Sequence, residues 1–246
     1  MTLPNVPSAV LLDAAATTTF VGLDGIGAGT TLDASAANAI LDGRVQFDFA
    51  SSTGWTLTNG SGGAAITGGV AQLTMPAGVA SFDVGRASIV RSLPGISNPI
   101  GFRAAVRLVA ITNGDGNTQT GYIFRSTAAT NELRVVVQPN GVVLVGYVGG
   151  GFTPLATSGV LVAWDGTWWV QVAYLGTRLY VRVGQGTTTT PPSDDSASWR
   201  IVWSGDLYPY LSAGPPWDTI GLYLTTYGAG GGAITVEFDD VIVEAI

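Results

Sequence analysis

Apolar residues recur at every second position over long stretches after residue 44, and this period restricts the fold more than any other feature. It is typical of β-strands with one buried face, because successive side chains of a strand point to opposite sides. In residues 102–111, Arg103 and Arg107 share one side, which we expect to meet water. The other side of this stretch carries Phe102, Ala104, Val106 and Leu108.

Further runs of this kind predict short strands separated by residues typical of turns. They are 47–49, 55–57, 70–75, 80–84, 121–126, 132–138, 142–147, 168–174, 178–183, 199–203, 219–226 and 233–243. The sequence Pro139-Asn140-Gly141 predicts a tight hairpin between two of them, since Asn-Gly tolerates the positive φ that primed turns require.

The composition agrees with many strands joined by turns, because 46% of the residues are hydrophobic and only 11% are charged. A chain of 246 residues is within the range that a single β-sandwich reaches. We therefore predict an all-β protein in which residues 45–246 form one antiparallel β-sandwich. Residues 1–44 are predicted to be an N-terminal arm, within which 33–41 is either a short helix or a linker.

The charge pattern excludes one class of partner. The net charge is −7, and the ten basic residues, all of them arginine, are scattered singly along the chain, so no basic patch for nucleic acid is predicted. The sequence also lacks the roughly 18 consecutive apolar residues that insertion into a membrane requires. No basic residue precedes the first apolar stretch, so no secretory signal peptide is predicted.

Six short motifs occur in a suggestive order: FDF, WTLT, GGVAQL, WWVQV followed by GTRLYV, TIGLYL and VEFDDVIV. This order resembles the concanavalin A-like lectin and glucanase jelly roll, in its laminin G-like branch, over about residues 45–246. The resemblance implies two curved antiparallel sheets and, in many relatives, sugar binding on the concave face. It leaves the function open, because this fold hosts lectins, hydrolases and structural modules.

The residue types argue against catalysis. The absence of His and Cys excludes Ser-His-Asp triads, Cys-His pairs and imidazole-based zinc chemistry. Glycoside hydrolysis needs two carboxylates about 5 to 10 Å apart. The resemblance implies that hydrolytic members carry them in a motif of the E-x-D-x-x-E type, which none of Glu132, Glu237 and Glu244 begins. We therefore expect that the protein is not an enzyme.

The C-terminal run VEFDDVIV predicts an irregular strand. Strict alternation from Val236 would bury Asp240 and expose Val241, so we expect a β-bulge at Asp239 and Asp240. In several relatives an acidic residue here joins the first strand in a structural Ca²⁺ site, so the resemblance implies Asp48 with Asp239 or Asp240 as candidate ligands. The alternative is that these carboxylates bond turn amides or face solvent. No other cofactor is predicted.

Aromatic residues suggest where a glycan would bind, because sugar rings stack on exposed aromatic side chains. We predict a platform made of Trp169, Tyr208, Tyr210 and Trp217. The alternative is that most tryptophans fill the core, which is the prediction for Trp168 and Trp203. Within the pair Trp168 and Trp169, one side chain must point away from the core if the segment is a strand.

Taken together, these features favour a non-enzymatic structural or adhesion protein of a bacteriophage virion, such as a minor tail, fibre or capsid-surface component. The arm would contact other virion proteins, the chain would form a homo-oligomer in the extracellular particle, and the sandwich would bind cell-surface glycans. An unusually high mean hydropathy of +0.37 agrees with surface hidden in an assembly. The alternatives are a free bacterial carbohydrate-binding module and a diverged glycoside hydrolase.

Overall fold

The structure, a computed structural model, describes residues 44–92, 101–125, 132–148, 152–158, 162–175, 178–193, 195–206, 219–228 and 232–245. These residues form fifteen β-strands and no helix. In chain order the strands are β1 (Arg44–Phe47), β2 (Thr56–Thr58), β3 (Gly63–Thr67), β4 (Val70–Met75), β5 (Ala87–Ser92), β6 (Gly101–Thr112), β7 (Thr118–Arg125), β8 (Glu132–Val137), β9 (Val143–Val148), β10 (Phe152–Thr157), β11 (Trp168–Leu175), β12 (Arg178–Gln185), β13 (Arg200–Asp206), β14 (Thr219–Thr226) and β15 (Ile234–Ala245).

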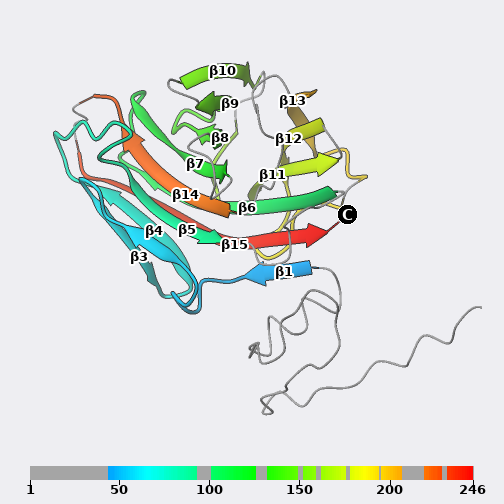
Figure 1. Ribbon diagram of the computed structural model, residues 1–246, viewed down its shortest axis with the longest axis horizontal. Helices are drawn as coiled ribbons and strands as arrows, with labels where there is room; N and C mark the ends of the chain where they lie inside the picture. Colours follow the sequence, from blue (N-terminus) through cyan, green and yellow to red (C-terminus); the bar gives the residue numbers. More distant parts are fainter. Residues whose placement is uncertain are drawn as a thin grey trace, which may run out of the picture.

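The strands make two sheets that pack face to face (Figure 1). One has eight strands in the order β13-β12-β11-β6-β15-β4-β3, with β1 added beside β15. The other has seven strands in the order β10-β9-β8-β7-β14-β5-β2, and neighbours in both sheets are antiparallel. The prediction of an all-β antiparallel sandwich is therefore confirmed.

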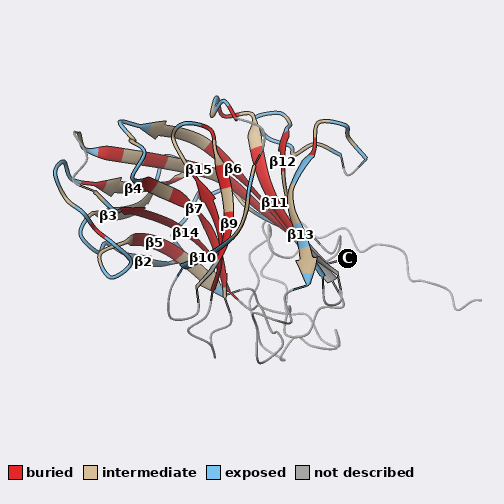
Figure 2. Cartoon of the chain, turned by 90° about the horizontal axis from the view of Figure 1, so that it is seen from above, coloured by how far each residue is buried: buried red, intermediate tan, exposed pale blue. Residues whose placement is uncertain are grey.

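The two inner faces meet in one hydrophobic core, as the alternating pattern requires. In β14, Ile220, Leu222 and Leu224 point into this core, and β4 places Leu73 and Met75 opposite them in the other sheet. Buried residues run along the strands, whereas exposed ones gather in the loops that join them (Figure 2). We call the side of each sheet that faces away from this core its outer face.

Strand β15 pairs with β6 along most of its length and contains the predicted bulge. Asp239 lies opposite Arg107 and Val241 opposite Val106, so Asp240 is an extra residue, and it adopts a positive φ of 51°. Both Phe238 and Val241 consequently point into the core. The predicted bulge at Asp239 and Asp240 is confirmed.

Two local predictions are wrong. Residues 80–84 form turns instead of a strand, because the amides of Ser81 and Phe82 both donate to the carbonyl of Thr226 and draw the chain away from the sheet. The first predicted strand stops at Phe47, since Phe49 adopts a φ of 54° and stacks on Trp55 with ring centroids 5.1 Å apart. Strands β3, β5 and β10 were not anticipated.

The hairpin between β8 and β9 is present, but its turn differs from the expected primed type. Gly141 has a positive φ of 86°, whereas Asn140 does not share it. The Asn140 side-chain oxygen instead accepts a hydrogen bond from the Val142 amide at 3.2 Å. The turn is therefore stabilised by the Asn side chain and one left-handed residue.

Apart from Arg44, the predicted arm lies outside the described residues, and so does the candidate helix at 33–41. Among the described residues, no helix has the length and apolar character needed to span a membrane.

Gly121 in β7 generates a test of this packing. Its φ is 136°, and a Cβ atom there would lie 1.9 Å from the Val135 carbonyl oxygen of β8. We expect Gly121→Ala to lower the free energy of unfolding by at least about 2 kcal/mol, measured by urea denaturation. In Gly116→Ala, where the new Cβ meets nothing within 4 Å, the change should stay within about 0.5 kcal/mol. Equal stability of the two variants would contradict the close approach of β7 and β8.

Candidate functional site

Trp169, one of the predicted sugar-binding aromatics, is buried. It lies on the outer face of the eight-stranded sheet, where it packs with Ala105, Trp199 and Ile242 and is 0% exposed. Its indole N–H donates to the carbonyl of Thr187 at 2.9 Å. The prediction that Trp169 contacts a glycan is therefore wrong, because the segment after β12 covers the side chain.

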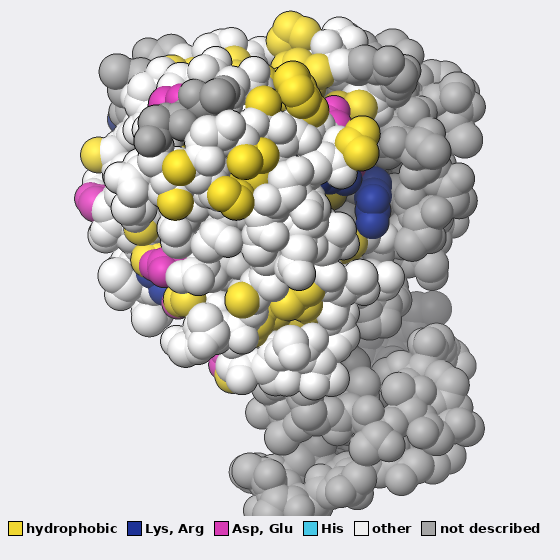
Figure 3. All heavy atoms as spheres, turned by 90° about the vertical axis from the view of Figure 1, so that its left-hand side faces the viewer, with side chains coloured by type: hydrophobic (Ala, Val, Ile, Leu, Met, Phe, Trp, Pro, Cys, Tyr) yellow, Lys and Arg dark blue, Asp and Glu magenta, His cyan; other side chains and the backbone are white. Residues whose placement is uncertain are grey.

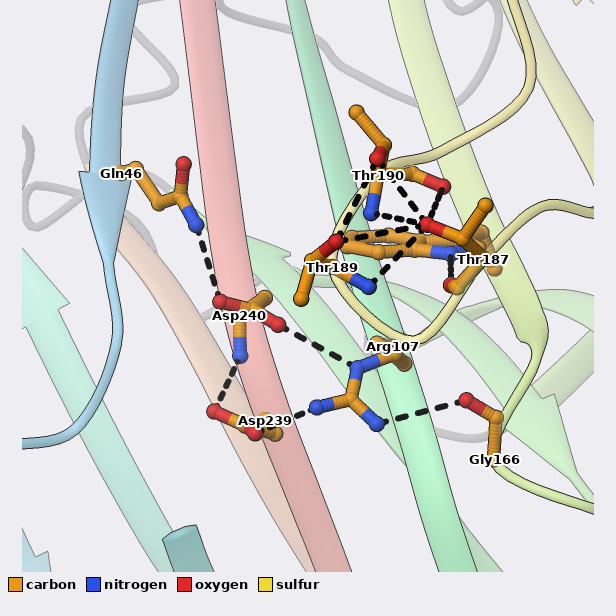
Figure 4. Close-up of polar contacts among 9 residues, drawn as sticks. Gln46, Arg107, Gly166, Thr187, Thr189, Thr190, Asp239 and Asp240 are labelled. Carbon is orange, nitrogen blue, oxygen red and sulfur yellow. Dashed lines mark hydrogen bonds and ion pairs between the residues drawn. The ribbon is translucent and has the colours of Figure 1, made fainter. Parts of the chain in front are cut away.

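A set of threonine contacts holds that covering segment (Figure 4). The Thr187 hydroxyl accepts hydrogen bonds from the amides of Thr189 and Thr190 at 3.2 and 2.9 Å.

Trp168, on the inner face, is half-buried against the core, as is Trp203, which agrees with the prediction for both. Tyr208, Tyr210 and Trp217 lie outside the described residues, so their glycan contacts stay predictions.

The predicted calcium ligands Asp239 and Asp240 lie on the outer face of the eight-stranded sheet and bind Arg107 (Figure 4). The Arg107 guanidinium donates to Asp239, to Asp240 at 3.2 Å and to the Gly166 carbonyl at 3.3 Å. Gln46 of β1 donates to the other Asp240 oxygen at 2.9 Å. Arg107 is buried by these contacts, so the expectation that it meets water is wrong.

This donor set does not fit a calcium ion. Arg107 already supplies the positive charge, and a second cation beside it would be repelled. Asp48 is exposed and accepts a hydrogen bond from the Ala50 amide at 3.1 Å, which closes a turn. Among the described residues, no group of three or more acidic side chains is arranged to hold a metal. Asp48 bonds a turn amide, as in the alternative prediction, whereas Asp239 and Asp240 pair with Arg107, which neither prediction included.

The surroundings of these two carboxylates shift the pKa of Asp239. Burial raises the pKa of Asp239, and the adjacent Asp240 carboxylate raises it further, while Arg107 opposes both effects. The ionised form of Asp239 is therefore destabilised, and the ion pair with Arg107 offsets this destabilisation only in part.

A second polar cluster lies on the outer face of the seven-stranded sheet. Glu132 and Arg134 alternate in β8 with inward-pointing Leu133 and Val135, so both charged side chains point outward. Both are nevertheless buried, at 4% and 1% exposure. Buried charges need close partners, so the surrounding contacts decide what this cluster can do.

Each charge in this cluster is paired. The Glu132 carboxylate accepts from Arg86 at 2.6 and 3.2 Å and from Arg134 at 2.6 Å. Arg134 also donates to Asp83 at 2.7 Å, and the Tyr227 hydroxyl donates to the same Asp83 oxygen at 3.0 Å. Arg134 therefore bridges a buried carboxylate and a half-exposed one.

The pairing keeps both carboxylates ionised. Burial alone would raise the pKa of Glu132, but hydrogen bonds and charges from Arg86 and Arg134 outweigh it and lower the pKa. The same balance lowers the pKa of Asp83, with Arg134 as its main opposing partner. Burial raises the pKa of Tyr223, whose hydroxyl has no hydrogen-bond partner among the described residues.

Beside this cluster lies a groove of about 320 Å³, which we call the hydroxyl groove. Its hydroxyl-bearing residues are Thr56, Thr58, Ser88, Ser92 and Thr219, and its charged residues are Asp83, Arg86 and Arg125. Val84 and Val90 complete the lining. Chemically, the groove offers many neutral hydrogen-bonding groups with a few charges, and this suits a polyhydroxylated ligand better than an apolar one.

Sequence reasoning did not identify this site. The alternation in 132–138 was sufficient to place Glu132 and Arg134 on the outer face. Their partners Asp83 and Arg86 come from a segment 46 or more residues earlier that was expected to be partly a strand, so no local pattern pointed to the cluster.

Comparisons with known proteins identify the fold. No protein-family model and no curated protein matches the chain. The CBM2 module of the evolved Dit of Lactobacillus casei BL23 phage J-1 aligns over 82% of this chain and 94% of its own, with 15% identity and a TM-score of 0.55. A prokaryotic β-1,3-1,4-glucanase (lichenase) derived from a mouse hindgut metagenome aligns over 82% and 99%, with 13% identity and a TM-score of 0.54.

A third similar structure is much longer than this chain. The GH43B protein of the Bacteroides ovatus xyloglucan PUL aligns over 82% of this chain but only 39% of its own, with 14% identity and a TM-score of 0.54. At these identities the likeness concerns the fold alone. The expectation of an antiparallel β-sandwich agrees with the fold of these structures.

Glu132 offers a test of the buried network. Because its pKa is lowered in the folded protein, its stabilising effect is present above its unfolded pKa and is lost as the pH falls through the folded pKa. We expect Glu132→Gln to lower the free energy of unfolding at pH 7 by about 3 kcal/mol or more, since two arginines lose their partner. The variant should then lose less stability than the wild type between pH 5 and pH 3, measured by chemical denaturation.

Glu237→Gln is the matched control, because Glu237 accepts a hydrogen bond from Gln72 and has no arginine partner among the described residues. Its effect at pH 7 should stay below about 1 kcal/mol. Equal losses in both variants would contradict a special role for the Glu132 network.

Trp169→Ala tests the burial of that side chain. Removing a fully buried indole should lower the free energy of unfolding by about 3 to 5 kcal/mol, measured by thermal or chemical denaturation. A variant with wild-type stability would show that the segment after β12 does not cover Trp169.

Proposed function

We propose that this chain is a non-enzymatic structural or adhesion protein of a bacteriophage virion, and that its sandwich binds cell-surface glycans in the hydroxyl groove. The observation that carries the glycan part is the lining of that groove. Five Ser and Thr hydroxyls converge there with the Asp83 carboxylate and the Arg86 guanidinium. Such groups match the alternating donors and acceptors of a saccharide.

Exposed apolar side chains beside the groove support this assignment. The rings of Phe82 and Tyr227 pack edge to face with centroids 5.7 Å apart, and the two residues are 54% and 37% exposed. Asp83 and Val84 follow Phe82 directly, and both line the groove. An aromatic pair next to polar groups is the arrangement that recognises the apolar and hydroxylated sides of a sugar ring together.

The surface chemistry supports the same class of partner. On the face shown in Figure 3, charged side chains are few, and hydrophobic ones are scattered among uncharged groups. With a net charge of −7, such a surface offers little to a phosphate backbone. Neutral or weakly charged ligands remain the more suitable partners.

The virion assignment has separate support. The similar structure from phage J-1 is a module of a Dit protein, and this chain covers 94% of that module. The proposed location is the extracellular particle, where the N-terminal arm would contact other virion proteins and the chain would form a homo-oligomer. A free bacterial carbohydrate-binding module is the alternative, and it would use the same groove.

Hydrolysis is the second alternative, favoured by the similar glucanase and GH43B structures. A glycosidase needs one carboxylic acid with a raised pKa to protonate the leaving group. Asp83 and Glu132 are bound by the same Arg134 and have lowered pKa values, which disfavours that role. Turnover of any polysaccharide in a broad panel, abolished in Glu132→Gln but not in Glu237→Gln, would overturn the non-enzymatic proposal.

The glycan proposal predicts specific binding on a glycan array. The double variant Thr56→Val with Thr58→Val removes two exposed hydroxyls of the groove while keeping side-chain shape, so affinity should fall about tenfold. Thr153→Val, at an exposed position of β10 in the same sheet, should bind like the wild type. Absence of binding to every glycan would contradict the proposal.

The virion proposal predicts that gold-labelled antibodies against this chain decorate purified particles in electron micrographs. Label restricted to the host cytoplasm, or to medium free of particles, would contradict it and favour the free module.

A further inference from the structure

Arg125 is a cation of the hydroxyl groove that has no partner among the described residues. It is the last residue of β7, points to the outer face and is half-buried. Its guanidinium makes no hydrogen bond or ion pair with any residue that the structure describes, whereas Arg86 and Arg134 on the same face are both held by carboxylates. A half-buried charge without a counter-ion is costly, so its retention points to a ligand.

The nearest acidic side chains are already committed to other groups. Glu132 lies directly opposite Arg125 in the pairing of β7 with β8. Its two oxygens nevertheless bind Arg86 and Arg134. The Asp83 oxygen that is hydrogen-bonded binds Arg134 and the Tyr227 hydroxyl. Three arginines face two carboxylates here, which leaves one excess positive charge in a chain whose net charge is −7.

Hydroxyl groups extend from Arg125 across the sheet. Thr219 of β14 pairs with Arg125 on one side and with Ser92 of β5 on the other, so the three residues form one row. All three line the groove. Ser88 continues the hydroxyl lining along β5 toward Asp83. The groove therefore combines one anion-binding end with a neutral, hydroxyl-rich length.

We infer that the hydroxyl groove takes an acidic saccharide, whose carboxylate binds Arg125 while its neutral rings lie along β5 and β2. A guanidinium can bind a carboxylate through two parallel N–H···O hydrogen bonds, which fixes the orientation of a sugar acid as well as its charge. This inference rests on the proposed glycan binding and specifies the chemical class of the glycan.

The test uses the full chain and oligosaccharides that contain uronic acid, each paired with its neutral counterpart in which the carboxyl is reduced to a hydroxymethyl group. We expect the acidic member of a pair to bind at least tenfold more tightly in calorimetric titration. Arg125→Gln should remove this preference by weakening acidic binding about tenfold to a hundredfold, to the level of the neutral member. Arg125→Lys, which keeps the charge but loses the planar fork, should retain part of the preference.

Arg178→Gln is the matched control, since Arg178 is an exposed arginine of β12 in the other sheet, and it should bind like the wild type. Equal binding of acidic and neutral members, or unchanged preference in Arg125→Gln, would overturn the inference and leave the proposed glycan binding intact. Tighter binding of a phosphate-bearing oligosaccharide than of the uronic acid would overturn the carboxylate assignment. Binding of no saccharide would overturn both. Urea denaturation of each variant shows whether weaker binding results from the loss of a ligand contact or from unfolding of the protein.

Discussion

The pairing of β15 with β6 is the interaction on which the larger sheet depends, because these two twelve-residue strands join its halves. Beyond β6 lie β11, β12 and β13, and beyond β15 lie β1, β4 and β3. Two irregularities adjust the pair. The partner of β15 skips from Ala110 to Leu108, which leaves Val109 of β6 unpaired, and Asp240 is the extra residue on β15. Each bulge re-phases its own strand, so Ile111 and Val241 both contact the core.

The bulge on β15 also explains the ion pairs on the outer face. Consecutive residues of a regular strand point to opposite sides, yet Asp239 and Asp240 both bind Arg107, because the positive φ of Asp240 breaks the alternation. The left-handed conformation costs about 1 kcal/mol or more for a non-glycine residue. Contacts of Asp240 with Arg107 and Gln46 offset that cost, so the bulge and the ion pairs stabilise one another.

The outer face of the seven-stranded sheet also carries buried charges that are paired with one another, and there they lie beside the hydroxyl groove. Glu132 and Arg134 are buried there, and the network is satisfied by Asp83 and Arg86 from the segment before β5. Its carboxylates are ionised at neutral pH, and Asp83 and Arg86 of the network line the hydroxyl groove. The groove is thus lined by Asp83 and Arg86, which this network holds in place, and by Arg125, which has no hydrogen bond or ion pair with any described residue.

Period-two patterning predicted the sandwich, most strands and the bulge, because those features follow from keeping one face of each strand apolar. It failed where long-range contacts decide the conformation. The segment 80–84 looks like a strand, yet hydrogen bonds from Ser81 and Phe82 to Thr226 turn it away from the sheet. Trp169 does point away from the core, as alternation requires, but the segment after β12 covers its side chain, so a ligand could not reach it.

The sequence by itself determined which side of most strands faces the core, because the side to which a side chain points follows the local period. It also determined the chemistry that is absent, since no His or Cys occurs anywhere in the chain. Only the tertiary structure decided which polar residues lie together: Asp83 with Arg134, Arg107 with Asp239 and Asp240, and Arg125 beside Thr219 in the neighbouring strand. Such encounters join residues far apart in the chain, and sheet order and register, which local sequence does not encode, bring them together.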